Sequence, residues 1–387
     1  MSIQILNKNK TLMVLLVQSI IFIFLVFVFD LILWAFSPVS LDNRMVESLL
    51  TQDLPGLKST IVYKSGKYGL RSLSEIDDVK PNNLISILCL GASTTNQPTQ
   101  ETQDTWCGIL ETKLQEYYGH SDLKFQTMAF GVGGFRASND ALWIQETFDK
   151  IKPDIVITLL GINDLAWNGG IDYKYSSINE IFSKKRDSSI IKWLKKYSQI
   201  FRRVVFIKEK LMTKIMLKTG GFVEWHSSNL PDLRGKYQNY PYIENLIRNP
   251  DPINEFRDTI SWIATFLKQK KVQVIMLGQP VLWKESFDPI EFNRLWFSVS
   301  TPKGPVRPSG AWLKREMARY NFVQQSIASQ SAISYINLDD NIPKTLDYYF
   351  DDCHFTDLGS MAVADNILPV LINVVDNLLV NKGLEKP

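Results

Sequence analysis

Short apolar runs alternate with longer amphipathic segments from Leu84 to the C-terminal region, and this alternation constrains the fold more than any other feature. Such a pattern is typical of βα units, in which each helix returns the chain to the same edge of a parallel sheet. The expected strands cover 84–90, 124–130, 154–160, 272–277 and 333–338, and the expected helices cover 105–118, 138–150, 253–270, 312–330 and 358–379. The sequence therefore predicts an α/β fold, a three-layer sandwich built on a five-stranded parallel sheet.

An almost unbroken apolar run precedes this region, from residue 12 to residue 36. At about 1.5 Å per residue, a helix of this length exceeds the roughly 30 Å hydrocarbon core of a bilayer. The run is longer than the apolar part of an ordinary signal peptide, and no A-x-A cleavage site follows it. We therefore expect one uncleaved N-terminal transmembrane helix that anchors the chain.

The charges that flank this run predict its orientation. Lys8 and Lys10 precede it, whereas Asp42, Arg44 and Glu47 follow it. Positive residues are retained on the cytoplasmic side of a membrane helix. Residues 1–11 are thus expected in the cytoplasm, and the rest of this single-pass protein in the periplasm or at the cell surface.

The remaining chain divides into a connector at 37–83, expected to pack on the domain, and a large domain at 84–387 with an insertion at about 165–250. The third and fourth expected strands lie more than a hundred residues apart, far more than a crossover needs. The segment from Lys184 to Lys218 holds twelve basic and two acidic residues, interleaved with apolar ones. Two interpretations of this mostly helical insertion stay open: an amphipathic helix on anionic lipid headgroups, or a solvated cap over the domain.

Composition excludes several classes of site. Lys and Arg total 43 against 40 Asp and Glu, a balance that gives no reason to expect nucleic acid as a partner. The three cysteines show no CxxC or Cys/His spacing, so neither a zinc site nor a disulfide framework is expected. We expect no metal and no cofactor.

Two polar motifs offer a nucleophile and a base. Ser93 follows the first expected strand, at the carboxyl end where open α/β sheets bind their ligands. Near the C-terminus, Asp351 precedes His354 by three residues in a loop before the last expected helix. A carboxylate at this spacing can hold one ring nitrogen and leave the other to take a proton. Each motif alone is more often structural, but both are expected on one edge of one sheet.

Two further loops at that edge offer hydrogen-bond donors for a developing negative charge. The second expected strand runs into a turn that contains Gly131, Gly133 and Gly134, and the third is followed by Asn163. Glycine lets backbone N–H groups approach a ligand closely, and an asparagine amide is a neutral donor. Both loops suit an oxyanion hole.

The four blocks resemble, in their order, those of the SGNH or GDSL-type hydrolase family, here as a membrane-anchored member of bacterial type. The resemblance covers about 84–379 without the insertion and implies that family's flavodoxin-like fold. It implies that Ser93 is the nucleophile and that Asp351 and His354 are the acid and base. It also implies an oxyanion hole formed by the Ser93 N–H, the Gly134 N–H and the Asn163 amide.

Two positions depart from the family pattern. Ala92 stands where the family name has aspartate, and Ala129 where asparagine often opens the second block. Neither position supplies a side chain that takes part in the implied mechanism. Among competing groups, Cys89 lies within an apolar strand and Cys353 beside His354, so both are expected to be packing or loop residues.

The two other histidines also have simpler interpretations. His120 stands at an expected helix end and His226 in the insertion, and for both we favour solvated or capping roles.

The sequence therefore predicts a serine ester hydrolase that removes acyl groups, such as acetyl, from an extracytoplasmic glycan or lipid-like ester through an acyl-serine intermediate. One alternative is an O-acyltransferase for a cell-envelope glycan, and another is a non-catalytic glycan-binding or assembly protein on the same fold. Four aromatic residues offer either sugar stacking or ordinary packing, which we favour: Trp167, Tyr173, Trp225 and Trp283.

Overall fold

The computed structural model describes residues 2–36, 44–49, 60–65, 67–76, 80–119, 121–168 and 230–382, with residues 194, 197–201, 203 and 204 between the last two ranges. His120, Tyr173, Trp225, His226 and most of the basic insertion lie outside these residues. The chain divides into two compact units, Met1–Asn43 with Lys184–Val223, and Arg44–Ser183 with Glu224–Pro387. The domain boundaries expected from the sequence stay predictions.

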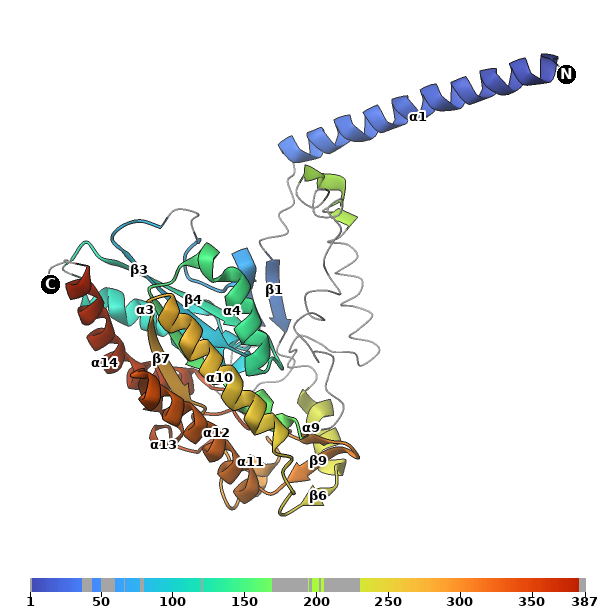
Figure 1. Ribbon diagram of the computed structural model, residues 1–387. Helices are drawn as coiled ribbons and strands as arrows, with labels where there is room; N and C mark the ends of the chain where they lie inside the picture. Colours follow the sequence, from blue (N-terminus) through green and yellow to red (C-terminus); the bar gives the residue numbers. More distant parts are fainter. Residues whose placement is uncertain are drawn as a thin grey trace. The chain divides into compact units, whose positions relative to one another are not determined.

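The second unit is built on a five-stranded sheet in which every neighbouring pair is parallel (Figure 1). Its strands are β3 (Leu84–Gly91), β4 (Lys124–Gly131), β5 (Ile155–Leu159), β7 (Gln273–Gly278) and β10 (Ser334–Asn337), in the order β10-β7-β5-β3-β4. By position along the chain this order is 2-1-3-4-5, the flavodoxin-like arrangement. The fold-class prediction is confirmed, because all five expected strands form and pair in parallel.

Helices cover both faces of this sheet. On one face lie α3 (Trp106–Tyr117) and α14 (Asp357–Asn381), and on the other lie α4 (Ala137–Ile151), α10 (Asp251–Gln269) and α12 (Gly310–Ser331). Alternate residues of β3 pack on opposite sides, with Ile87 and Cys89 against the first pair of helices and Leu88 and Leu90 against the other three. A strand buried on both faces needs a continuous apolar run, which is why these strands stand out in the sequence.

Smaller elements surround the sheet. A second sheet joins β6 (Tyr242–Ile243), β9 (Gly304–Pro308) and β8 (Val299–Thr301), and a separate antiparallel pair joins β1 (Arg44–Leu49) to β2 (Thr60–Ser65). Short helices are η1 (Lys67–Gly69), α2 (Ser93–Asn96), η2 (Thr102–Asp104), α5 (Ile162–Ala166), α9 (Leu230–Asn239), α11 (Pro289–Phe292) and α13 (Leu338–Asn341). Most of these short strands and helices carry too little periodicity to be predicted from the sequence.

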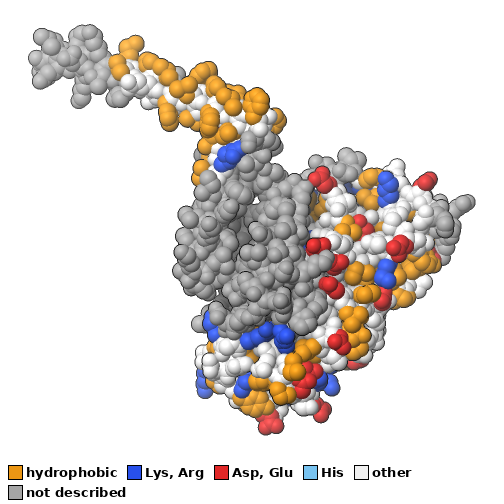
Figure 2. Space-filling model, turned by 180° about the vertical axis from the view of Figure 1, so that it is seen from behind, with side chains coloured by type: hydrophobic (Ala, Val, Ile, Leu, Met, Phe, Trp, Pro, Cys, Tyr) orange, Lys and Arg blue, Asp and Glu red, His pale blue; other side chains and the backbone are white. Residues whose placement is uncertain are grey.

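The first unit contains α1 (Ser2–Phe36), whose described apolar side chains are largely exposed (Figure 2). Its one described carboxylate, Asp30, accepts hydrogen bonds from the Ile200 N–H at 2.6 Å and the Ser198 hydroxyl at 3.1 Å. These bonds join the helix to a short segment of the insertion within the same unit.

Two helices among the described residues are long and apolar enough to cross a membrane, α1 from Val17 to Phe36 and α14. Helix α14 belongs to the core, since Val363, Ile367, Leu371 and Val375 are fully buried on it. Of the two, α1 is the one with an exposed apolar surface.

Candidate active site

Ser93 begins helix α2 directly after β3, the strand that lies between β4 and β5. The connection after β3 leads to α3 on one face of the sheet, and the connection after its neighbour β5 leads to α10 on the other. The crevice at such a switch point is where open α/β sheets bind ligands. Ser93 is buried, with 5% of the residue exposed. As the first residue of a helix, Ser93 carries one of the N–H groups that have no acceptor within that helix.

Two glycines allow the chain to turn this tightly at Ser93. A Cβ atom on Gly91 would lie 2.5 Å from the carbonyl oxygen of Leu159, and one on Gly131 would lie 2.3 Å from that of Ala92. Backbone atoms at these distances cannot yield to a side chain. Glycine at the ends of β3 and β4 is therefore a packing requirement of the turn that carries Ser93.

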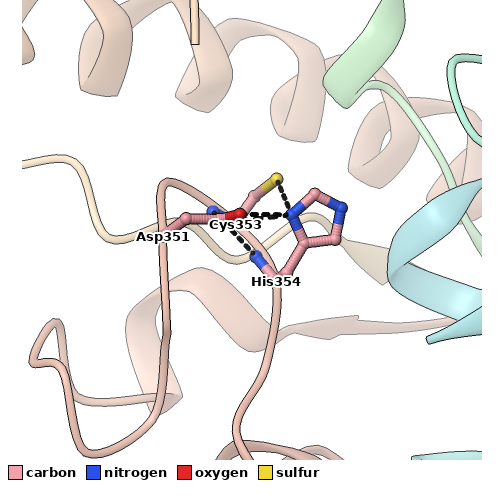
Figure 3. A group of neighbouring side chains, drawn as sticks. All are labelled: Asp351, Cys353 and His354. Atoms are coloured by element: carbon pink, nitrogen blue, oxygen red, sulfur yellow. Dashed lines mark hydrogen bonds and ion pairs between the residues drawn. The ribbon is translucent and has the colours of Figure 1, made fainter. Parts of the chain in front are cut away.

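The two ring nitrogens of His354 form hydrogen bonds with different residues, one with the Ser93 hydroxyl and the other with the Asp351 carboxylate. The distance from Ser93 Oγ to His354 Nε2 is 2.8 Å, and His354 Nδ1 lies 2.9 Å from each carboxylate oxygen of Asp351. Figure 3 shows Nδ1 turned toward Asp351, with the second ring nitrogen pointing away from it. The arrangement is a hydrogen-bonded chain from carboxylate to imidazole to hydroxyl, the order found in serine hydrolases.

A short loop before α14 sets the spacing of Asp351 and His354. The Phe350 N–H donates to the His354 carbonyl at 3.1 Å, and a backbone bridge between Tyr349 and Phe355 closes the loop. Thr356 then caps α14 by accepting from the Gly359 N–H at 3.1 Å. Asp351 and His354 are thus held together by local backbone structure, which explains why a three-residue spacing suffices for their contact.

Asp351 is fully buried, yet its surroundings favour the charged form of its carboxyl group. Burial opposes its ionisation, yet the neighbouring His354 and hydrogen bonds from His354, the Cys353 N–H and the Trp296 indole lower the pKa of Asp351 below its ordinary value. A carboxylate that stays charged beside Nδ1 favours the tautomer with a proton on Nδ1 and leaves Nε2 to accept one from Ser93.

The adjacent carboxyl group behaves differently. Burial, and next to it the charge of Asp351, raises the pKa of Asp352 to about 6. Its oxygens accept from the Trp283 indole at 2.8 Å and from the N–H groups of Trp296 at 2.7 Å and Phe297 at 2.9 Å. Asp352 therefore joins the acid loop to two other segments and does not contact His354.

Cys353 is a poor nucleophile here. Its sulfur lies 3.6 Å from His354 Nδ1, the nitrogen that faces Asp351, and burial together with the charges of Asp351 and Asp352 raises the pKa of the thiol well above its ordinary value. Cys89 is fully buried within β3. Both cysteines are buried, as the sequence suggested.

The two expected donor loops meet each other through one hydrogen bond. Asn163 Nδ2 donates to the Phe135 carbonyl at 2.8 Å, which joins α5 to the turn after β4. In that turn the Phe135 N–H donates to the Val132 carbonyl, and Gly134 has a φ of +80°, a left-handed conformation that suits glycine. The contacts among the described residues thus bring Gly134 near Asn163, and Ser93 to His354.

Trp283 and Trp167, two of the four aromatic residues considered for sugar stacking, lie among the described residues. Trp283 is fully buried, so packing is the correct interpretation for it. Trp167 is partly buried, with the Arg136 guanidinium 4.8 Å from its ring centroid.

Residues 89–241 match the model of the GDSL-like lipase/acylhydrolase family. This part of the chain is similar to that family. The matched segment holds Ser93, Gly134 and Asn163, whereas the loop with Asp351 and His354 lies beyond it. The contact between His354 and Ser93 is therefore seen in the structure and not in the family match.

No curated protein matches the chain. Solved structures similar to this chain include the acetyl xylan esterase AlAXEase, at 12% identity over 74% of this chain and 99% of that one, with a TM-score of 0.39. The acetylxylan esterase Axe2 from Geobacillus stearothermophilus shares 13% identity over 76% and 95%, with a TM-score of 0.38. TesA shares 11% identity over 74% and 97%, with a TM-score of 0.40. These values are too low to bear on the substrate.

Proposed function

We propose that the protein is a serine ester hydrolase in which Ser93 is the nucleophile, His354 the general base and Asp351 the residue that orients and stabilises the base. The observation that supports this most is the 2.8 Å hydrogen bond between Ser93 Oγ and His354 Nε2, with Asp351 on the opposite ring nitrogen. A serine hydroxyl is a weak nucleophile until an adjacent base removes its proton.

The reaction follows from these positions. Nε2 of His354 takes the Ser93 proton as Oγ attacks the ester carbonyl, and the charge that forms on the imidazole is balanced by Asp351. The alcohol leaves with the proton that His354 holds, which gives an acyl-serine. Water then attacks the acyl group by the same proton transfers and releases the acid.

The oxyanion of each tetrahedral intermediate needs donors on the opposite side from the base. We assign this role to the N–H groups of Ser93 and Gly134 and to the amide of Asn163. An asparagine amide carries two hydrogens, and the bond to Phe135 uses one and orients the other. Fixed neutral donors of this kind stabilise developing charge without reorganisation.

We place the substrate outside the cytoplasm, as an acyl ester, such as an acetyl ester, on a glycan or lipid-like molecule near the membrane. Helix α1 supports this, because its apolar surface is exposed and its length fits a bilayer. Ser198 and Ile200, described residues of the insertion, bond Asp30 of this helix within the same unit.

Turnover of p-nitrophenyl acetate by the full chain in detergent tests the proposal. The Ser93→Ala variant should lose about 10⁴-fold or more in kcat. Ser86→Ala is the matched control, because Ser86 is buried at the opposite end of the same strand, and it should retain activity. Equal activity of wild type and Ser93→Ala would refute the proposal.

A further inference from the structure

Trp296 stands 55 residues before Asp351 and donates its indole N–H to that carboxylate, at 2.9 Å from Oδ2. We propose that Trp296 is a positioning residue of the triad, one that holds the Asp351 carboxylate in the rotation that serves His354. The proposal rests on the serine hydrolase function proposed above and adds to it a residue that no motif of the sequence contains.

The donors around Asp351 are unevenly shared between its two oxygens. Oδ1 accepts from the backbone N–H groups of Cys353 at 3.0 Å and His354 at 2.9 Å. Apart from His354 itself, Trp296 is the residue in the described part of the chain that donates to Oδ2. The loop backbone therefore fixes one oxygen, and the indole fixes the other.

Trp296 is itself held in place by the neighbouring carboxylate. Its backbone N–H donates to Asp352 Oδ2 at 2.7 Å, beside the bond from the Phe297 N–H, while Asp352 Oδ1 accepts from the Trp283 indole. Both carboxylates thus bind the segment that contains Trp296. Asp352 accepts from backbone N–H groups of this segment, and Asp351 accepts from the indole side chain. The segment that carries the indole therefore cannot move away from the loop of Asp351 and Asp352 without breaking hydrogen bonds to both carboxylates.

The ring of Trp296 also lies nearly parallel to the imidazole of His354. The ring centroids are 6.2 Å apart and the planes differ by 12°. Phe350 lies 5.6 Å from the same imidazole at 21°. Aromatic neighbours at these distances limit the tilt of the histidine ring while Nε2 remains directed at Ser93.

The charged and titratable groups around Asp351 decide the pH response. They are His354, Asp352, Cys353 and Arg234, the last of which reaches the Phe350 carbonyl at 3.5 Å from the α9 side. If the indole donor is removed, Asp351 presents more unshielded negative charge to His354, which favours the protonated ring. The acid side of the pH–activity profile should then move to higher pH.

The test pairs Trp296→Phe with Trp283→Phe. Each removes one indole N–H from one of two consecutive buried carboxylates, and only Asp351 contacts His354. With p-nitrophenyl acetate, Trp296→Phe should lower kcat by about 10- to 100-fold, the value of a hydrogen bond to a charged group, with little change in KM. The acid limb of its pH–activity profile, where activity increases with pH, should move to higher pH by about half a unit to one unit.

Trp283→Phe should lower thermal stability but leave the acid limb where it is. The proposal is overturned if Trp296→Phe retains the wild-type kcat and pH profile, or if both variants move the acid limb equally. Should Trp296→Phe fail to fold, 3-benzothienylalanine at position 296 replaces the N–H by sulfur and keeps the ring shape. The same shift of the acid limb is expected from it.

A measurement without turnover separates this inference from the proposed function. The proton on Nδ1 of His354 gives a far-downfield NMR signal when it is bonded to a carboxylate, and loss of the indole donor should move that signal. If wild type hydrolyses the ester but neither the signal nor the profile moves in the variants, only the role of Trp296 fails. If wild type itself has no activity, the hydrolase proposal fails and the role of Trp296 falls with it.

Discussion

The Asn163 amide nitrogen lies 2.8 Å from the carbonyl oxygen of Phe135, so the helix after β5 and the turn after β4 are joined at the residue proposed to stabilise the oxyanion. This bond aims the second amide hydrogen. Asn163→Ala should therefore lower kcat by about 10²- to 10³-fold, with a smaller change in KM, because the donor acts on charge that develops in the transition state. Steady-state kinetics with p-nitrophenyl acetate checks it, and a loss confined to KM would exclude this role.

The raised pKa of the next residue, Asp164, leads us to expect that the free energy of unfolding depends on pH. Burial raises the pKa of Asp164 from its ordinary value of 3.8 to about 7, although its carboxylate accepts from the Ala137 N–H at 3.1 Å. Between these pH values the folded protein holds a proton that the unfolded chain has released. The contribution of Asp164 is thus fully present below about pH 4 and is lost as the pH rises toward 7.

Asp164→Asn keeps the acceptor for Ala137 and removes the ionisation. The difference in unfolding free energy between this variant and wild type should change in the variant's favour by more than about 1 kcal/mol between pH 5 and pH 8. Urea unfolding at both pH values measures this difference, in which groups common to both proteins cancel. A difference that does not depend on pH would contradict the assignment.

The hydrogen bonds of Arg71 lead us to expect that the segment before β3 stabilises the turn that follows Ser93. Arg71 is 2% exposed, and its guanidinium donates to the carbonyls of Asn96 at 2.6 Å, Gln97 at 2.9 Å and Gln100. Arg71→Ala leaves these carbonyls without their donor and should cost roughly 3 kcal/mol or more, at about 1.5–3 kcal/mol per hydrogen bond to a charged group.

Arg257→Ala is the matched control for Arg71, because Arg257 is exposed on α10 and bonds only Asn254 among the described residues. It should change the unfolding free energy by no more than about 0.5 kcal/mol. Denaturant titration of both variants decides, and equal midpoints would show that Arg71 does not support the turn.

Because helix α1 is long and apolar enough to cross a membrane, we expect the chain to be stably attached to it. Expressed in full, the chain should sediment with membranes and resist extraction by alkaline carbonate, whereas a chain without residues 2–36 should be released. Recovery of the full-length gene product as a soluble protein cut after residue 36 would instead identify α1 as a cleaved signal sequence.

The sheet and the triad contacts could be predicted from sequence because each rests on a local pattern. Strands buried on both faces need continuous apolar runs, and every expected strand forms within two residues of its predicted ends. Asp351 and His354 meet within one short loop, and Ser93 follows a strand whose position is clear from its apolar run. Contacts of this kind can be inferred from spacing.

The supports of the site could not be predicted in the same way. Trp296 reaches Asp351 across 55 residues, and Arg71 reaches Asn96, Gln97 and Gln100 across 25 to 29. Nothing in the local sequence around either residue marks its partner. The strands β6, β8 and β9 are two to five residues long, too short for a period of two to appear.

Mapping a fluorophosphonate adduct by mass spectrometry tests the central claim most directly, because the probe reacts with a serine that a neighbouring base activates. The account predicts one adduct, on Ser93, that is absent from Ser93→Ala and strongly reduced in His354→Ala. An unlabelled wild-type protein, or an adduct on another serine that persists in Ser93→Ala, would contradict it.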